Sequence, residues 1–391
     1  MKTKSILISG ASVAGPALAY WLNRYGFEVT ILERAPGIRP GGYAVDFRGA
    51  AIEVLEKMNL LEKMRCHATL TGAINIVDKH NRRIARMPDG FTSGELEILR
   101  GDLANVLYDA SRHDVEYIFN DNITFLREHI DGVEVTFEKH APRSFDLVIG
   151  ADGLHSNVRK IAFGNEAQFR RHLGLYFAIF SVPNFLKLGM DGVFYGTPGK
   201  RAGVFGACDG AEARATLYFA SAALQYNRHD IDEQKLLVRE RFAQEAWVVP
   251  ELLEYMDASP DFYFDTMSQI KMERWHNGRI ALVGDAAHCA SPMSGLGTSM
   301  AIVGAYILAG ELKKAAGDYT LAFRHYEAQM RPFVEKGQQL AEGGPTWFVP
   351  TTPFKHWLSL QLWKILPYSP WKNMMIEMPA KISRMIKPVV Y

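Results

Sequence analysis

The stretch SILISGASVAGPALAYWLNRYGFEVTILE, residues 5–33, decides the fold of this chain. Its short apolar run predicts a buried strand over residues 5–10, and helical spacing follows over residues 16–25. Gly26 is the residue type that commonly follows the last turn of a helix. Residues 27–33 alternate as in a second strand. Together these elements predict a strand–helix–strand unit of about thirty residues.

The glycine-rich turn of this unit has the spacing of a dinucleotide-binding fingerprint. Such a turn needs a glycine where the chain bends, a small residue beside the pyrophosphate, and a glycine where helix and strand pack. Gly10, Ser12 and Gly15 hold these positions, and Ser12 departs from the usual glycine. Glu33, 18 residues after Gly15, ends the second strand, where an acid accepts hydrogen bonds from ribose hydroxyls. We therefore predict that phosphates bind at the N-terminus of the first helix.

A secretory signal peptide is the alternative interpretation of the N-terminus. Lys2 and Lys4 precede an uncharged run over residues 6–22, and small residues within it are spaced as at a cleavage site. The glycines and the proline that interrupt this run, and Glu33 beyond it, favour the strand–helix–strand unit.

The composition is that of an ordinary globular protein of about two domains. Of 391 residues, 48% are hydrophobic and 22% are charged, and the net charge of +1 gives no sign of a nucleic-acid partner. No other uncharged run approaches the ~20 apolar residues that span a bilayer. Three widely spaced cysteines, Cys66, Cys208 and Cys289, fit a reducing cytoplasm. We expect a cytoplasmic monomer.

The rest of the chain has α/β texture at both ends and β-rich texture in the middle. Helical spacing predicts further helices over residues 94–112, 232–247 and 297–314, with Asp230 or Asp232 capping the second. Short aromatic and β-branched runs separated by glycine and proline predict antiparallel sheet over residues 173–220. Asp131 and Gly132 suggest a hairpin turn, and apolar runs predict strands over residues 145–149 and 279–283.

This pattern predicts an α/β protein in which a Rossmann-type domain is interrupted by an antiparallel β-sheet domain. The nucleotide-binding domain is assigned residues 1–72, 95–168 and 266–335, the β-rich substrate domain residues 73–94 and 169–265, and a helical extension residues 336–391. The extension is basic and aromatic. It is either a set of packed helices or a helix that lies on a membrane surface.

Two further segments place an aspartate directly after an apolar strand. In FDLVIGADGLHSNVRK the aspartate is Asp152, which also fits a helix cap, and in GRIALVGDAAHCASPMSGLG it is Asp285. His288 and Cys289 lie close enough in sequence to Asp285 to suggest a metal site. However, a metal needs three or four converging ligands, and no partner motif is present elsewhere in the chain. We therefore expect no metal, and we interpret His288 and Cys289 as packing residues.

With these three motifs in this order, the chain resembles the FAD-dependent aromatic monooxygenases of the para-hydroxybenzoate hydroxylase fold. GPALAYWLNRYGF, EILRGDL, FYFDTMSQIKMERWHNGRIALVGDAAHCASPMSGLG and VGAYILAGELKKAAGDY are most similar to the tetracycline-inactivating members. The likeness covers the chain to about residue 335. The motifs and this resemblance together imply FAD contacts from Gly10, Ser12, Ala14, Gly15, Glu33, Arg34, Arg39, Asp46, Arg48, Arg100, Asp152, Asp285, Pro292, Gly295, Leu296, Gly297 and Thr298.

The resemblance also implies the reaction. NADPH or NADH visits transiently and reduces FAD, O2 adds to give a flavin C4a-hydroperoxide, and one oxygen is transferred to an electron-rich phenol or enol. The cofactor performs the chemical step, so we name no catalytic residue. Gly41 and Gly42 beside the flavin contacts fit either flavin movement or a plain tight turn.

A polycyclic aromatic substrate is expected between the flavin and the β-rich domain, with tetracycline as the leading candidate. Its expected contacts are Phe177, Tyr195, Arg201 and Tyr218, although Tyr218 stands where one branch of the family has histidine. Trp347, Phe348 and Trp357 of the extension either line this pocket or pack elsewhere. The alternatives are a biosynthetic aromatic-polyketide hydroxylase, a flavin carrier without oxygenase activity, and a membrane-peripheral epoxidase or lipid reductase.

Overall fold

The computed structural model describes residues 4–39, 42–69, 71–88, 90, 94–207 and 210–391. Its first layer is a six-stranded sheet in the order β17-β18-β11-β1-β2-β7, and all neighbours except β17 and β18 are parallel. The strands are β1 (Ser5–Ser9), β2 (Glu28–Glu33), β7 (Glu116–Phe119), β11 (Leu147–Gly150), β17 (His276–Asn277) and β18 (Ile280–Leu282). Three segments that lie far apart in the sequence therefore build one sheet.

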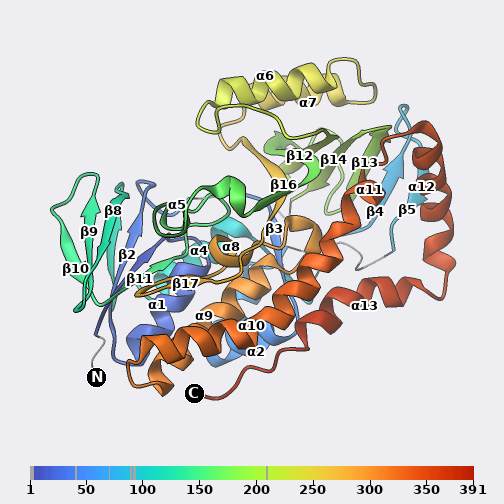
Figure 1. Cartoon of the computed structure of the whole chain (residues 1–391). Coiled ribbons are helices and arrows are strands. Elements are labelled where there is room, and N and C mark those ends of the chain that lie inside the picture. Colours follow the sequence, from blue (N-terminus) through green and yellow to red (C-terminus); the bar gives the residue numbers. More distant parts are fainter. Residues whose placement is uncertain (1–3, 40–41, 70, 89, 91–93, 208–209) are drawn as a thin grey trace.

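Helices bury this sheet and explain its continuous apolar strands. Ile6, Leu7 and Ile8 of β1 are completely buried, as expected for a parallel strand that is covered on both faces. Helix α1 (Ala14–Arg24) packs on α9 (Gly297–Lys314), which in turn packs on α2 (Ala50–Lys57) and α10 (Tyr319–Glu342) (Figure 1). Smaller elements complete this part of the molecule: α3 (Leu61–Cys66), α4 (Arg100–Asp109), α5 (Asn157–Phe163), η1 (Glu166–Gln168), α8 (Asp285–His288), η2 (Pro292–Ser294), and the sheet of β8 (Ile123–Glu128), β9 (Val133–Phe137) and β10 (Arg143–Phe145).

The second layer is a seven-stranded sheet in the order β16-β12-β15-β14-β13-β4-β5. Its strands are β4 (Ile74–Val77), β5 (Arg83–Arg86), β12 (Arg170–Pro183), β13 (Gly192–Thr197), β14 (Lys200–Gly206), β15 (Glu212–Ala220) and β16 (Tyr263–Ile270). Helices α6 (Ile231–Phe242) and α7 (Val249–Ala258) cover one face, and Asp230 caps α6 by accepting from the Glu233 N–H. All neighbouring strands in this sheet are antiparallel except β13 and β4. The inserted, mainly antiparallel sheet is therefore confirmed, while the exact domain limits stay predictions.

One expected helix is wrong in its first part. Residues 96–99 form β6 (Leu96–Leu99), which pairs with β3 (Ala44–Phe47), and only then does α4 begin. The side chains of Leu96 and Ile98 are buried while Glu97 and Leu99 are partly exposed, so the period is two and not 3.6.

The C-terminal extension is helical, as predicted, and joins the two sheets. Helix α11 (Gly344–Phe348) packs on β12, α12 (Pro353–Ile365) packs on β5, and α13 (Lys372–Ser383), after η3 (Leu366–Tyr368), packs on α10 (Figure 1). In the part of the chain that the structure describes, no helix is both long and apolar enough to cross a bilayer.

The last residues return to the first layer and form a strap over α9. The Ser383 hydroxyl donates to the Arg48 carbonyl, and the Tyr306 hydroxyl donates to the Val389 carbonyl at 2.6 Å. The Tyr391 hydroxyl donates to Glu311 Oε1 at 2.9 Å, and its ring lies against Gly310, where a Cβ would come within 2.1 Å of it.

Candidate active site

The turn after β1 admits glycine alone at two positions. Gly10 has φ +111°, its N–H donates to the Leu32 carbonyl at 2.7 Å, and a Cβ there would lie 2.5 Å from the Ala151 carbonyl oxygen. A Cβ on Gly15 would lie 1.9 Å from the Gly10 carbonyl oxygen. Helix α1 begins here and has no side-chain cap, so the first N–H groups of the helix are available to an anion.

Glu33 lies beside this turn, as its place at the end of β2 predicts. Its carboxylate accepts from the Ala11 N–H and from the Ala35 N–H, each at 2.9 Å. These two bonds fix the carboxylate next to the phosphate-binding position and leave acceptor capacity for a ribose hydroxyl.

A second helix N-terminus converges on the same place. Gly284 lies against α1, because a Cβ on it would be 3.1 Å from Ala14 Cβ. Helix α9 begins at Gly297 without a side-chain cap, and a Cβ on Gly297 would lie 3.9 Å from Asp285 Oδ1. Desolvation by the surrounding protein raises the pKa of Asp285, although the residue is exposed. The positive ends of two helix dipoles therefore face one region.

Strand β3 supplies the opposite side of this region. Arg48 Nη2 lies 3.3 Å from Asp46 Oδ2, and Asp46 Oδ1 accepts from the Gly94 N–H at 2.8 Å. Gly295 is adjacent, since a Cβ on it would lie 3.9 Å from Asp46 Oδ2. Burial, only partly offset by Arg48, raises the pKa of Asp46 to about 6. The Nε of Arg48 is buried without a hydrogen-bond partner among the described residues.

Arg100 connects the turn to an aromatic wall. Its Nη2 donates to Ser12 Oγ at 3.2 Å, and its guanidinium lies 5.8 Å from the ring centre of Tyr43. The Tyr43 ring lies 6.1 Å from that of Tyr263, which lies 5.8 Å from Phe177 on the seven-stranded sheet. Sequence reasoning missed both tyrosines; the only signal for Tyr263 was its alternation in β16 with Asp265, which accepts from its hydroxyl at 2.7 Å.

The wall continues to Arg201. The ring of Phe177 lies 6.2 Å from that of Tyr218, and Tyr218 lies 4.9 Å from Phe348 of α11. The Arg201 guanidinium lies 4.4 Å from the Phe348 ring centre and 5.1 Å from that of Phe194. Phe177, Tyr218 and Arg201 are thus brought together, along a path of rings that leads to Arg100.

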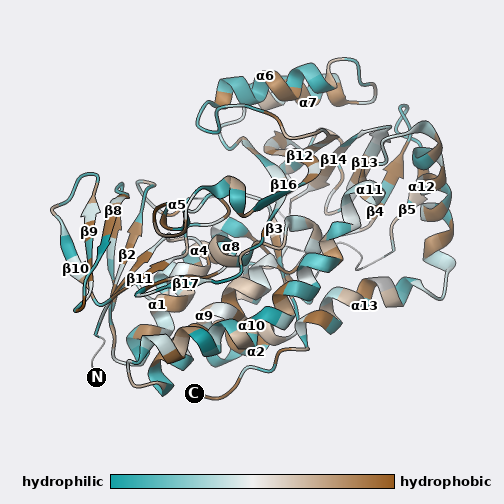
Figure 2. Cartoon of the chain, viewed as in Figure 1, coloured by the Kyte–Doolittle hydropathy of each residue, from teal (hydrophilic) through white to brown (hydrophobic). Residues whose placement is uncertain are grey.

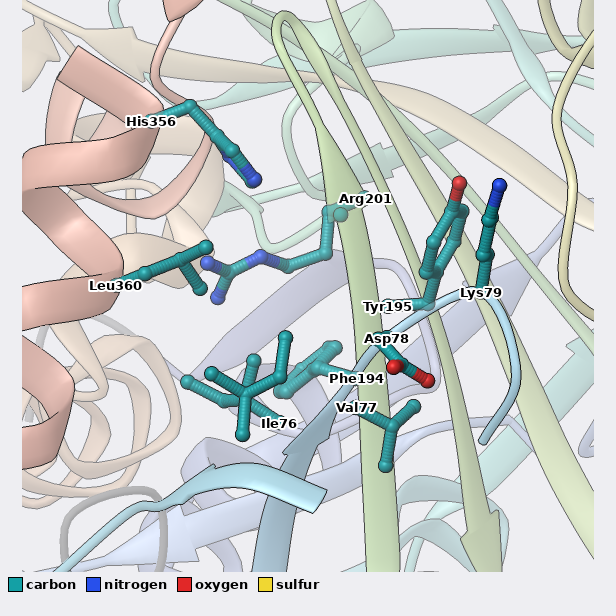
Figure 3. A pocket seen from close by; sticks show the side chains of 11 residues that line it. Ile76, Val77, Asp78, Lys79, Phe194, Tyr195, Arg201, His356 and Leu360 are labelled. Carbon is teal, nitrogen blue, oxygen red and sulfur yellow. The ribbon is translucent and has the colours of Figure 1, made fainter. Parts of the chain in front are cut away.

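Arg201 reaches into a cavity of about 190 Å³ between the sheet and α12. In Figure 3 its side chain points toward His356 and Leu360 of that helix. Arg201 is only 5% exposed, and its Nη1 has no hydrogen-bond partner among the described residues. Burial lowers the pKa of Arg201 to about 10, so the side chain remains a cation at neutral pH.

The structure gives the other expected contacts varied surroundings. Tyr195 belongs to the opposite face of the sheet, where its ring lies 5.7 Å from that of Trp247, although it also borders the far end of the cavity in Figure 3. The Asp152 carboxylate accepts from Ser156, which is the N-cap residue of α5, and from the N–H groups of residues 157 and 158. Its Cα borders the turn after β1, because a Cβ on Gly10 would lie 2.9 Å from it. Of the remaining expected contacts, Arg34, Arg39 and Pro292 are exposed, Leu296 is buried and Thr298 is partly exposed at the start of α9; Gly41 lies outside the described residues.

His288 and Cys289 have protein partners. His288 Nε2 lies 3.3 Å from the Tyr326 hydroxyl and its ring lies 4.7 Å from Trp275, and burial lowers its pKa to about 3. Cys289 Sγ lies 3.6 Å from the Ser268 carbonyl oxygen. Within the described ranges, no three histidine, cysteine or acidic side chains are grouped to hold a metal.

A parallel sheet, a glycine turn, and two uncapped helix N-termini beside Glu33 and Asp285 define a protein that binds a dinucleotide cofactor next to an aromatic-walled site. A family model described as an FAD binding domain matches residues 3–339. The chain therefore belongs to this family of FAD-binding proteins, and it is an FAD-dependent monooxygenase, as its relatives show.

An uncharacterized protein of Mycobacterium tuberculosis is 49% identical over 343 residues, which are 86% of this chain and 92% of the relative. A flavin-dependent monooxygenase of Legionella longbeachae is 40% identical over 342 residues, 86% of this chain and 88% of the relative. The crystal structure of the tetracycline destructase Tet(51) has a TM-score of 0.86 at 35% identity and covers 100% of this chain and 99% of its own. The predicted fold class is therefore confirmed.

Proposed function

We propose that this monooxygenase hydroxylates a polycyclic phenol or enol and that its substrate is a tetracycline. The observation that carries the proposal is Arg201, a buried cation that forms no ion pair with a described residue, at the end of an aromatic wall that leads to the proposed flavin site. A ligand with flat rings and an ionised enol complements both features. The likeness to Tet(51) at 35% identity supports the same class of substrate.

The residues around the first layer fit FAD. Glycines that tolerate no Cβ, the uncapped N-terminus of α1 and the hydroxyl of Ser12 suit the pyrophosphate, and Glu33 suits the ribose of the adenosine. Asp285, Gly295 and Gly297 would hold the flavin half beside the start of α9. When bound and reduced by NADPH or NADH, FAD supplies an oxygen atom from O2 in an electrophilic form.

The protein side chains bind, orient and shield the substrate. The Arg201 guanidinium would hold an enolate or phenolate oxygen, which keeps the ring electron-rich, and Tyr218 and Phe177 would stack on the rings. The uncapped N-terminus of α9 stabilises negative charge beside it. Helices α11 and α12 cover this side of the sheet and exclude water. No protein nucleophile is needed. We further propose that the protein is a monomer and that it works in the cytoplasm, where NADPH and NADH are available.

Product mass spectrometry tests this proposal. The FAD-loaded protein is incubated with NADPH or NADH and with separate tetracyclines and anthraquinones. We expect a tetracycline to gain one oxygen atom and to lose its antibacterial activity, in parallel with nicotinamide oxidation. A mass gain by anthraquinones alone would instead indicate a biosynthetic hydroxylase. Nicotinamide oxidation that yields only hydrogen peroxide with every compound would contradict the proposed substrates altogether.

A further inference from the structure

Helix α12 carries an apolar stripe on its outward face. Phe354, Trp357, Leu358, Leu362 and Ile365 are all exposed, Phe354 by 68% and Ile365 by 62%. Their spacing places them on one side of the helix, within about 140° at 100° per residue. The rings of Phe354 and Trp357 stack on each other at 6.1 Å, so the stripe is continuous rather than scattered.

The opposite side of α12 already packs on the protein. Ser359 and Trp363 are buried, His356 and Leu360 line the Arg201 cavity, and the helix contacts β5. Figure 2 shows brown, hydrophobic segments along α12 and α13 at the edge of the molecule. A helix that is apolar on both sides is normally buried, and an exposed patch of this kind marks an interaction surface.

The chain that follows α12 extends the patch with aromatic side chains. Tyr368 is 89% exposed and Trp371 is 69% exposed, and Met374 of α13 is exposed beside them in the sequence. Tryptophan and tyrosine are the residues that prefer the boundary between lipid headgroups and acyl chains, because one part of each ring system is polar.

Positive charge borders the stripe. Lys355 and Lys364 lie on opposite edges of it by the same helical spacing, and neither forms an ion pair with any residue that the structure describes. Residues 344–391 contain six lysines and arginines but only one carboxylate, that of Glu377, which pairs with Lys381 at 3.0 Å. Exposed Arg83 of the neighbouring β5 adds to this charge.

We propose that α12 and the segment through Trp371 bind the surface of an anionic lipid bilayer. The stripe would lie among the headgroups, and Lys355 and Lys364 would reach lipid phosphates on both sides. A second copy of the chain fits less well, because a symmetric contact through this stripe would bring the same lysines together. Binding of α12 to the bilayer would also place His356 and Leu360, which line the Arg201 cavity, one helix diameter from the lipid.

Vesicle co-sedimentation of the full-length, FAD-loaded protein tests the proposal. We expect binding to vesicles of phosphatidylcholine with phosphatidylglycerol, little binding to pure phosphatidylcholine, and about tenfold weaker binding at high salt. W357S/I365S and K355E/K364E should each weaken binding about tenfold or more. Flavin absorbance and circular dichroism confirm that each variant is folded.

Matched controls distinguish this surface from general stickiness. F125S/I130S removes two exposed apolar side chains from β8 and the turn that follows it, at the other end of the molecule, and K160E/K336E reverses two exposed lysines of α5 and α10 (Figure 1). Both should bind like wild type. Equal binding to both lipids, unchanged binding of W357S/I365S, or equal losses in the controls would overturn the proposal. A dimer that W357S/I365S dissociates, with no vesicle binding, would make a second copy the occupant.

Discussion

Arg201 is expected to lower the stability of the fold and to bind the substrate. A buried cation that pairs with no carboxylate of the described residues destabilises the free protein, and an anionic ligand would relieve this cost. We expect R201M to raise the free energy of unfolding of the substrate-free protein, by about 1–3 kcal/mol, and to raise KM for a tetracycline at least tenfold. Urea unfolding and steady-state kinetics measure the two effects.

The control for this substitution is R127M. Arg127 is exposed and pairs with Glu134 on the three-stranded sheet, so its loss should change both quantities little. If R201M lowers stability and leaves KM unchanged, Arg201 is a packing residue and does not bind the substrate.

The close packing of Gly15 in the turn after β1 predicts that a larger residue there would clash. G15A would place a Cβ 1.9 Å from the Gly10 carbonyl oxygen, so strand and helix must separate. We expect a loss of about 1–3 kcal/mol of stability and a purified protein that retains little FAD. The ratio of flavin to protein absorbance measures retention. G343A is the matched control, because Gly343 has φ −81° and no atom within 4 Å of a Cβ. Yellow G15A protein with a wild-type ratio would contradict this prediction.

Asp46 makes the stability of the FAD-free protein depend on pH. Its pKa of about 6 lies above the ordinary value of 3.8, so the folded state binds this proton more tightly than the unfolded state. The contribution of this group is complete below about pH 4 and is lost as the pH rises through about 6. D46N keeps an acceptor for the Gly94 N–H but cannot ionise. It should therefore gain, relative to wild type, up to about 3 kcal/mol between pH 4 and pH 7 in urea unfolding. Parallel pH profiles would show that Asp46 is not the group responsible.

Site residues could be predicted from the sequence where the interaction that requires them arises within a short segment. Gly10 and Gly15 could be predicted because the clash that requires them arises within the turn and its adjoining strands. Tyr43 and Tyr263 could not, because 220 positions separate them and only the packing of the two sheets brings their rings together. Tyr195 stays a predicted substrate contact: it packs among the residues that α6 and α7 cover and also borders the Arg201 cavity, and alternation in a strand does not show in advance which face a helix covers.

At the level of elements, local signals failed where a partner strand decided the structure. Residues 96–99 lie within a helical rhythm, yet their pairing with β3 makes them a strand and holds Asp46 beside the flavin site. By contrast, α9 begins and ends where its sequence predicts, at Gly297 and Lys314, because its apolar periodicity extends over five turns.

The strap over α9 gives a prediction for this element. Y391F loses only the hydrogen bond to Glu311 and should cost about 1 kcal/mol. Y391A also empties the space beside Gly310 and should cost about 1–3 kcal/mol in thermal or urea unfolding. If both variants unfold like wild type, the strap does not stabilise the fold.

For the whole molecule, the proposed flavin site draws on segments that span residues 10–298, so the cofactor should stabilise the entire fold. At a concentration of 100 times its Kd, FAD should add about 2.7 kcal/mol to stability. FMN lacks the adenosine half that Glu33 and the turn after β1 would hold, so its effect should be clearly smaller. Thermal unfolding of FAD-free protein with each flavin measures the difference. Equal stabilisation by FMN would show that the turn does not bind the adenosine half.

The architecture was predictable because three ordered motifs constrain one sheet, whereas the arrangement of the C-terminal helices was not. Their apolar residues fit packed helices and a surface helix equally well in the sequence. The structure shows that one side of α12 packs on the protein while the other is exposed, with Trp363 buried and Trp357 accessible.

The position of Phe348 has a consequence for every affinity measured at Arg201. The protein already supplies a ring to this guanidinium, at 4.4 Å, and to Tyr218, at 4.9 Å. A ligand that stacks on Arg201 or Tyr218 must first displace the ring of Phe348. Its observed binding constant therefore reports the exchange of one ring for another. Small aromatic fragments should then bind poorly even though they fit, and ligands with several fused rings are favoured.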